Sequence, residues 1–214
     1  MRNVFVCESA YGCDGAYVVA TSGDVLARAP ESPLSPEEND RCLALGRRAD
    51  RMDFRAARIL VRLLLATVAE TAISDIRIWQ SCDRCGGPHG RPVVEDPRGY
   101  EVSWAHHDGL VAAAVARRAI GIDIISRRVT QGSPTGVLDE KGLCRFEALF
   151  KAGAYSASPP LRFDDLQRDD CVYLDRANRR LRILVHSTPL MEVCVASSCI
   201  LRSLHLVSLI SALA

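Results

Sequence analysis

The chain has 214 residues, a formal net charge of +1 and a charged fraction of 25%. This near-neutral balance provides no global field to draw the protein to nucleic acid or an anionic membrane, and the length allows one domain or two small halves packed together. The nine cysteines are odd in number and scattered, so the sequence predicts reduced thiols in the cytoplasm and not a secreted disulfide framework.

Short apolar segments and two helices open the chain. Valine-rich runs predict strands at 3–7 and 16–20. Residues 35–38, Ser-Pro-Glu-Glu, have the spacing of a helix start, with serine as N-cap, proline at the first helical position and glutamate closing a capping box. A longer helix is predicted over 50–71, because apolar residues recur along it at helical spacing.

Beyond this helix the sequence changes to short strands around a turn-rich segment at 81–92. Strands are expected at 76–79, 100–104, 110–116, 120–125, 171–175, 181–186 and 191–197. A further helix is expected over 139–154, and a short helix at the C-terminus. Two runs of helix plus antiparallel-type strands predict an α+β fold with two similar halves, residues 1–116 and 117–214, in one compact unit.

Three polar features interrupt the apolar elements. His106 and His107 lie in a polar kink, which could simply end a strand. Asp123 lies within a strand that otherwise looks fully buried, and a buried carboxylate is costly unless a cation or hydrogen bonds meet it. Glu147 and Lys151 lie one turn apart on a helix face, where a solvated ion pair is the ordinary interpretation. Asp123 is therefore the clearest single indication of function.

The order of these features resembles the surfactin-type 4′-phosphopantetheinyl transferase superfamily. Its members have a histidine kink, a strand ending in Gly-Ile/Val-Asp, here residues 121–123, and a helix with a Glu-Ala-x-x-Lys motif, here residues 147–151. The helix around 50–62 and the Gly-Arg-Pro turn at 90–92 are also similar, and the resemblance covers about residues 34–155. It implies two α+β halves related by a pseudo-twofold axis, with the active site between them.

The resemblance implies a reaction and a role for each site residue. A magnesium-dependent, monomeric enzyme would move phosphopantetheine from coenzyme A to a serine of an acyl or peptidyl carrier protein and release 3′,5′-ADP. Asp123 and Glu147 would bind Mg²⁺, and Glu147 would activate the serine. Lys151 would stabilise the leaving group, and His106 would hydrogen-bond the pyrophosphate. The candidates for the 3′-phosphate and adenine end are Arg48, Arg51, Arg58 and Arg91.

The sequence also departs from the family pattern. Ile125 replaces a second carboxylate, Phe146 a lysine and Ala105 a serine, and only 24 positions separate Asp123 from Glu147. Two other interpretations therefore stay open. One is an enzyme that uses the same fold for other acid–base chemistry in natural-product biosynthesis, and the other is a non-catalytic protein that binds coenzyme A or a carrier protein. The first of these would reuse His106, His107, Asp123 and Glu147.

A cysteine–histidine cluster lies in the turn-rich segment. Cys82, Cys85 and His89 could supply three zinc ligands, but no second pair follows at zinc-ribbon spacing. Cys13 or Cys42 could complete the set only from far along the chain. The sequence favours a turn with reduced thiols over a zinc site and leaves both open. A nucleic-acid zinc module is disfavoured, because a basic stripe with interleaved aromatic residues is missing.

Overall fold

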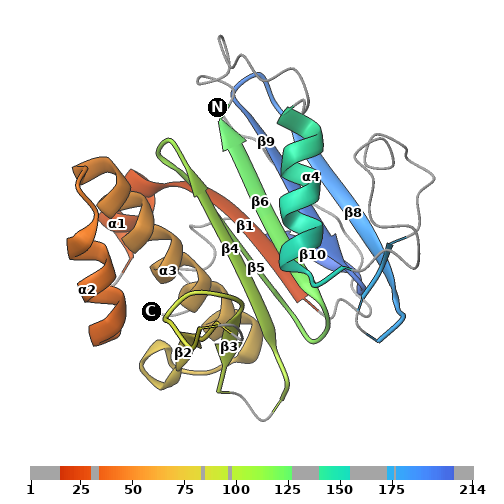
Figure 1. Ribbon diagram of the computed structural model, residues 1–214, viewed down its shortest axis with the longest axis horizontal. Coiled ribbons are helices and arrows are strands. Elements are labelled where there is room, and N and C mark those ends of the chain that lie inside the picture. Colours follow the sequence, from red (N-terminus) through yellow and green to blue (C-terminus); the bar gives the residue numbers. More distant parts are fainter. Residues whose placement is uncertain are drawn as a thin grey trace.

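The computed structural model describes residues 15–29, 34–82, 85–95, 98–126, 140–154, 173–175 and 177–204. Within these residues the fold is α+β, as predicted: two four-stranded sheets lie in the middle and helices lie on either side of them (Figure 1). The strand expected at 3–7 lies outside the described residues.

The first sheet has the strand order β10-β1-β5-β4. β1 (Gly15–Thr21) and β4 (Glu101–His107) both pair antiparallel with the central β5 (Leu110–Ala116). The turn between β4 and β5 is formed by Asp108 and Gly109, whose φ angles of 48° and 79° suit a tight hairpin. All three strands were predicted, although β4 runs three residues beyond the expected end and so includes both histidines of the polar kink.

α3 (Arg48–Ala69) covers one face of this sheet. Its 22 residues confirm the long helix predicted over 50–71, and its leucines are the centre of the first core. The sheet contributes the alternate side chains of its strands to this core, for example Val111 and Val115. α1 (Ser22–Arg28), which the sequence analysis did not predict, packs beside α3 and is capped by the Thr21 hydroxyl, which accepts a hydrogen bond from Asp24 N at 3.1 Å.

α2 (Pro36–Ala44) begins with the capping box that the sequence predicted. The Ser35 hydroxyl accepts a hydrogen bond from Glu38 N at 3.2 Å, and the Glu38 carboxylate accepts one from Ser35 N at 3.0 Å. The same carboxylate is buried and pairs with Arg62 of α3 at 2.7 Å. One residue therefore both starts α2 and fastens it to α3.

The second sheet has the order β6-β9-β8-β7 and is antiparallel throughout. Its strands are β6 (Ile120–Ser126), β7 (Tyr173–Leu174), β8 (Arg180–Ser187) and β9 (Met191–Ser197). α4 (Glu140–Lys151) packs on β6 and β9 and corresponds to the helix expected over 139–154. Each sheet thus carries a helix on its outer face.

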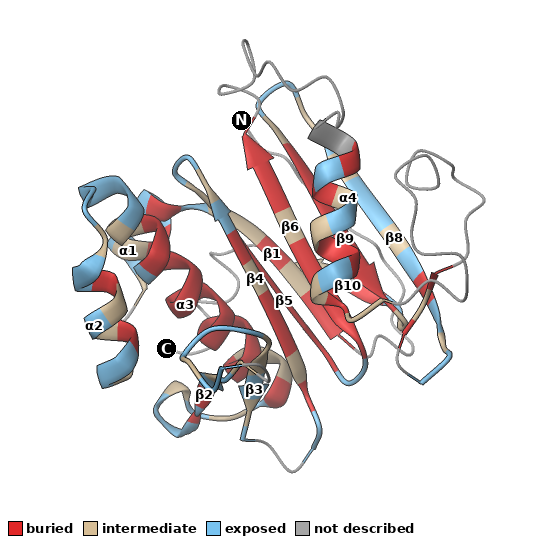
Figure 2. Ribbon diagram, in the orientation of Figure 1, coloured by how far each residue is buried: buried red, intermediate tan, exposed pale blue. Residues whose placement is uncertain are grey.

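The inner faces of the two sheets pack together through small and branched side chains. Buried alanines of β4 and β5 meet buried isoleucines of β6, forming the strip of buried residues at the centre of Figure 2. Side chains of β4 also bond the backbone of β6: Ser103 Oγ accepts from Ile122 N at 3.1 Å, and His107 Nδ1 accepts from Ser126 N at 2.8 Å. These two bonds fix β4 beside β6, and among the described strands no backbone ladder joins the two sheets.

The C-terminal part of the described chain returns to the first sheet. β10 (Leu201–Leu204) pairs in parallel with β1, with Leu201 opposite Gly15. These four residues thus form a strand, and residues 205–214, where the rest of the expected terminal helix would lie, are outside the described residues. Without β10, the edge of β1 that faces away from β5 would have unpaired backbone groups. Local sequence does not reveal this pairing between distant segments.

A two-stranded ribbon frames the turn-rich segment. β2 (Ile78–Gln80) and β3 (Pro92–Val94) pair antiparallel, following a short 3₁₀ helix, η1 (Ile73–Asp75). The described residues of the turn-rich segment, 81, 82 and 85–91, lie between these two strands in the chain. Within the described residues, no helix has both the length and the apolar character needed to cross a bilayer.

Candidate functional site

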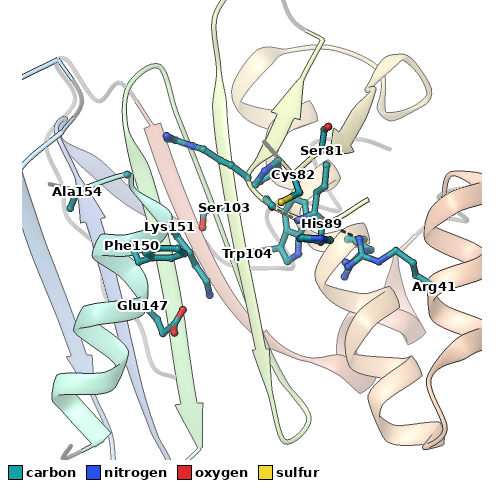
Figure 3. A pocket seen from close by; sticks show the side chains of 16 residues that line it. Arg41, Ser81, Cys82, His89, Ser103, Trp104, Glu147, Phe150, Lys151 and Ala154 are labelled. Atoms are coloured by element: carbon teal, nitrogen blue, oxygen red, sulfur yellow. Dashed lines mark hydrogen bonds between the residues drawn. The ribbon is translucent and has the colours of Figure 1, made fainter. Parts of the chain in front are cut away.

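A cavity of about 730 Å³ lies between α4, which packs on the second sheet, and the helices and strands around the first sheet. One wall comes from α4, the floor from β4, and the opposite wall from α2, α3 and the turn between β2 and β3 (Figure 3). The lining residues are Arg41, Arg58, Gln80, Ser81, Cys82, His89, Gly90, Arg91, Pro92, Ser103, Trp104, Glu147, Phe150, Lys151, Gly153 and Ala154. We call the α4 side the acidic wall and the arginine-bearing side the basic wall.

The acidic wall is built on a contact between β6 and α4. Lys151 Nζ lies 2.7 Å from Asp123 Oδ1 and donates to the Ile122 carbonyl at 3.2 Å. Burial raises the pKa of Asp123, the Lys151 ammonium opposes that rise, and the negative charge of Glu147 adds to it. The cost of burying this carboxylate, which the sequence indicated, is thus offset by a lysine 28 residues further along the chain.

Gly121 allows α4 to approach β6 closely enough for this contact. A Cβ atom at Gly121 would lie 2.0 Å from the Ala148 carbonyl oxygen and 2.5 Å from Ala152 N, both in the backbone around the end of α4. No side chain fits in that space, so the glycine sets how deeply the helix sits on the strand. The depth of the helix in turn sets the reach of Lys151.

Glu147 lies one turn before Lys151 and also lines the cavity (Figure 3). In the part of the chain that the structure describes, no ion pair joins these two side chains, because Lys151 turns to Asp123 instead. The solvated Glu147–Lys151 ion pair, which the sequence suggested as the ordinary interpretation, is therefore not formed. Asp123 and Glu147 both carry hard carboxylate oxygens, the ligand type that fits Mg²⁺. Glu147 is a lining residue of the cavity, whereas Asp123 lies behind Lys151 and is not.

Arg58 is the most constrained cation of the basic wall. Its guanidinium lies 3.2 Å from the centre of the Phe54 ring and 5.4 Å from that of Trp104, and its Nε lies 3.7 Å from Glu38 Oε1. Burial lowers the pKa of Arg58 to about 9, and the Glu38 charge opposes this effect. The stacking holds the guanidinium plane fixed at the cavity surface.

Arg41 and Arg91 complete the basic wall. Arg41 Nη1 donates to Gln80 Oε1 at 3.0 Å and to the Pro88 carbonyl, so the arginine is held by neutral oxygens. Arg91 pairs with Glu101 of β4. Sequence reasoning missed Arg41, because nothing in α2 alone indicates that this side chain reaches across to the turn at Pro88.

The other two predicted arginines lie elsewhere. Arg48 is exposed at the first position of α3, outside the cavity lining. Arg51 donates to the carbonyls of Leu45 and Gly46 at 2.6 and 3.2 Å and so holds the connection between α2 and α3. The fold therefore brings together Arg58 and Arg91 of the predicted set, and not Arg48 and Arg51.

The two histidines at the end of β4 differ in their surroundings. His106 has an exposed edge and does not line the cavity, but its pKa is lowered by partial burial and then by the neighbouring Arg58 cation. His107, on the opposite face of the strand, is engaged with Ser126 N. The surroundings of His106 thus favour its neutral form, and His107 links β4 to β6.

The positions that depart from the family pattern have structural roles. Ile125 is buried under α4, and its partner across the strands, Glu192, is fully buried with a carboxylate that accepts from Ser187. Ala105 is buried between the sheets, while Phe146 is 39% exposed and stacks on Phe150 with 6.4 Å between ring centres. A carboxylate in place of Ile125 would enter a core that already contains one.

Sequence reasoning missed several other residues that line the cavity, notably Gln80, Trp104 and Phe150. Trp104 follows Ser103 in a strand whose alternation could have indicated that its ring faces α3. Gln80 and Phe150 carry no local signal. No family model matches the chain, and no curated protein matches it at a significant level.

Proposed function

We propose that this chain is a 4′-phosphopantetheinyl transferase of two pseudo-twofold-related halves, which moves phosphopantetheine from coenzyme A to a serine of an acyl or peptidyl carrier protein. The observation that carries the proposal is the pairing of Lys151 with Asp123 at the wall of a cavity that three arginines also line. Strand, helix and turn motifs far apart in the sequence contribute to a single cavity.

The basic wall suits the phosphates of coenzyme A. Arg41, Arg58 and Arg91 present guanidinium groups to the cavity, and guanidinium binds phosphate oxygens in a bidentate manner. Trp104 and Phe150 add aromatic surface on which an adenine or the pantetheine chain can pack. A cavity of about 730 Å³ has the size of an ordinary small-molecule site.

The acidic wall suits the reacting end. Asp123 and Glu147 would hold a Mg²⁺ ion, which when bound would neutralise charge on the pyrophosphate. Glu147, directly or through water, takes the proton of the carrier serine as its Oγ forms a bond to the β-phosphorus of coenzyme A. The bond from that phosphorus to the bridging oxygen breaks, and 3′,5′-ADP leaves with the electron pair. Lys151 lies beside Asp123, where its ammonium stabilises the charge on the departing group.

The test is intact-protein mass spectrometry of a promiscuous apo carrier protein incubated with this chain, coenzyme A and Mg²⁺. We expect the carrier to gain the mass of phosphopantetheine, and the gain to disappear when Mg²⁺ is omitted and in Asp123→Asn. Omission is preferable to a chelator, which would also remove any other bound metal. Binding of coenzyme A by folded protein without transfer to several unrelated carriers would favour the non-catalytic interpretation, to which the burial of Ile125 gives some weight.

A further inference from the structure

The turn between β2 and β3 brings three metal-binding side chains together. Among the described residues, Cys82, Cys85 and His89 form the one cluster of cysteine, histidine or acidic side chains with potential ligand atoms all within 4.8 Å of one another. Cys85 Sγ lies 3.1 Å from His89 Nε2. Spacing along the chain made this set possible, but spacing alone could not show that the sulfur atoms and the ring converge.

The backbone of the turn is arranged around this cluster. Gly86 N donates to the Cys82 carbonyl at 2.7 Å, Cys82 N donates to the Gly87 carbonyl at 3.0 Å, and His89 N donates to the same carbonyl at 2.8 Å. A Cβ atom at Gly87 would lie 3.2–3.3 Å from the His89 ring and 3.3 Å from Cys85 Sγ. The glycine therefore leaves the space in which the thiol and the imidazole approach each other.

The donor set and its size match zinc. A tetrahedral Zn²⁺ ion, with bonds of about 2.3 Å to sulfur and about 2.0 Å to nitrogen, places its ligand atoms about 3.5–3.8 Å apart. The ligand atoms of this cluster lie from 3.1 Å (Cys85 Sγ to His89 Nε2) to at most 4.8 Å apart, a range that includes this spacing. Two thiolates and an imidazole are soft and borderline ligands, which disfavour the Mg²⁺ that the carboxylates of the acidic wall would suit.

We propose that Cys82, Cys85 and His89 bind one Zn²⁺ ion with an open fourth position, which water or an anion in the cavity occupies. Binding releases the two thiol protons, so the ion and its thiolates together are electrically neutral. Both Cys82 and His89 line the cavity, and they lie on its basic-wall side (Figure 3). This inference does not rest on the proposed transferase activity.

The bound ion would order the residues that position the basic wall. The Pro88 carbonyl, between two of the ligands, accepts from Arg41, and the Gly90 carbonyl, just after His89, accepts from Gln80 Nε2 at 2.7 Å. Gln80 in turn accepts from Arg41. A metal that fixes the turn therefore fixes the position of the Arg41 guanidinium.

The first experiment measures the metal content of the full chain. Protein purified in reducing buffer after growth with added zinc, then dialysed without chelator, is analysed by inductively coupled plasma mass spectrometry. We expect roughly one zinc per chain in the wild type and in Cys199→Ser, a cysteine outside the cluster, and a loss of most zinc in Cys85→Ser and in His89→Ala. Circular dichroism checks that each variant folds.

Zinc near the buffer background in folded wild-type protein would overturn the proposal, as would equal zinc in all four proteins. A second measurement replaces zinc by Co²⁺. We expect intense thiolate-to-cobalt charge-transfer absorption and the visible bands of a tetrahedral site, both absent in Cys85→Ser. Weak octahedral bands in the wild-type protein would also overturn the assignment.

Discussion

The two walls of the cavity hold their charges in opposite ways. On the basic wall Glu38 is shared by Arg58 and Arg62, and Arg41 is held by an amide and a carbonyl oxygen, so positive charge is in excess. On the acidic wall the Lys151 ammonium pairs with Asp123, which is not itself a lining residue, and Glu147 lines the cavity as a second carboxylate, so negative charge is in excess. We therefore expect the basic wall to bind an anion directly, and the acidic wall to bind a phosphate only through a bound cation.

The two walls also differ in how the desolvation of their buried charges is offset. Arg58 is buried against aromatic rings and keeps a carboxylate partner, so several contacts offset the cost of its desolvation. Asp123 depends on the Lys151 ammonium, with a backbone hydrogen bond at Ile124, and on the close seating of α4 over Gly121. The acidic wall should accordingly be the more fragile of the two, and variants there should have the larger effects.

The largest effect is expected for Glu147→Gln. This change keeps the shape of the side chain and removes the negative charge that remains after Lys151 has paired with Asp123. Transfer to the carrier protein should fall at least about 100-fold, as on loss of other electrostatic groups in active sites. Glu95→Gln, an exposed carboxylate outside the cavity, is the matched control and should transfer normally. Undiminished transfer by Glu147→Gln in the mass-spectrometric assay would remove this carboxylate from the mechanism.

Gly121→Ala tests whether the seating of α4 maintains the acidic wall. The added methyl group collides with the backbone at Ala148 and Ala152, so we expect the free energy of unfolding to fall by about 1–3 kcal/mol. Denaturant titration measures this change. Gly46→Ala is the control, because nothing lies within 4 Å of a Cβ atom there. An unchanged midpoint for Gly121→Ala, or an equal loss in both variants, would contradict the close approach of helix and strand.

The local features of the fold could be predicted from the sequence, whereas its long-range contacts could not. The capping box at Ser35 and the buried strand around Asp123 follow from neighbouring residues alone. The parallel pairing of β10 with β1, the placement of Arg41 beside the turn and the burial of Glu192 opposite Ile125 depend on strand register and on packing between distant segments. Asp123 was recognised as unusual, but neither the neighbouring residues nor the resemblance indicated that Lys151 pairs with it.

Arg41→Gln tests whether the basic wall binds the anionic end of coenzyme A. The guanidinium is lost while the hydrogen-bonding amide is kept, so the KM for coenzyme A should rise about tenfold, the value of one charge-assisted hydrogen bond, with a smaller change in kcat. Arg48→Gln removes an exposed arginine outside the cavity and should leave the KM unchanged. A larger rise in Arg48→Gln than in Arg41→Gln would place the anion near the start of α3 instead of in the cavity.

Lys151→Met probes the acidic wall through the pKa of Asp123, which carbon-13 NMR of its carboxyl group reports directly. Burial already raises this pKa, and the Lys151 charge and hydrogen bond act to lower it, so the pKa should rise further in the variant. Because the folded-state pKa lies above the unfolded value, the ionised carboxylate destabilises the fold at higher pH, and this penalty disappears as the pH falls through the folded-state pKa. Lys151→Met should therefore be less stable than the wild type at neutral pH and approach it on acidification. Carboxyl groups away from the cavity provide the internal reference, and an unchanged or lower pKa of Asp123 would show that the ion pair does not form in solution.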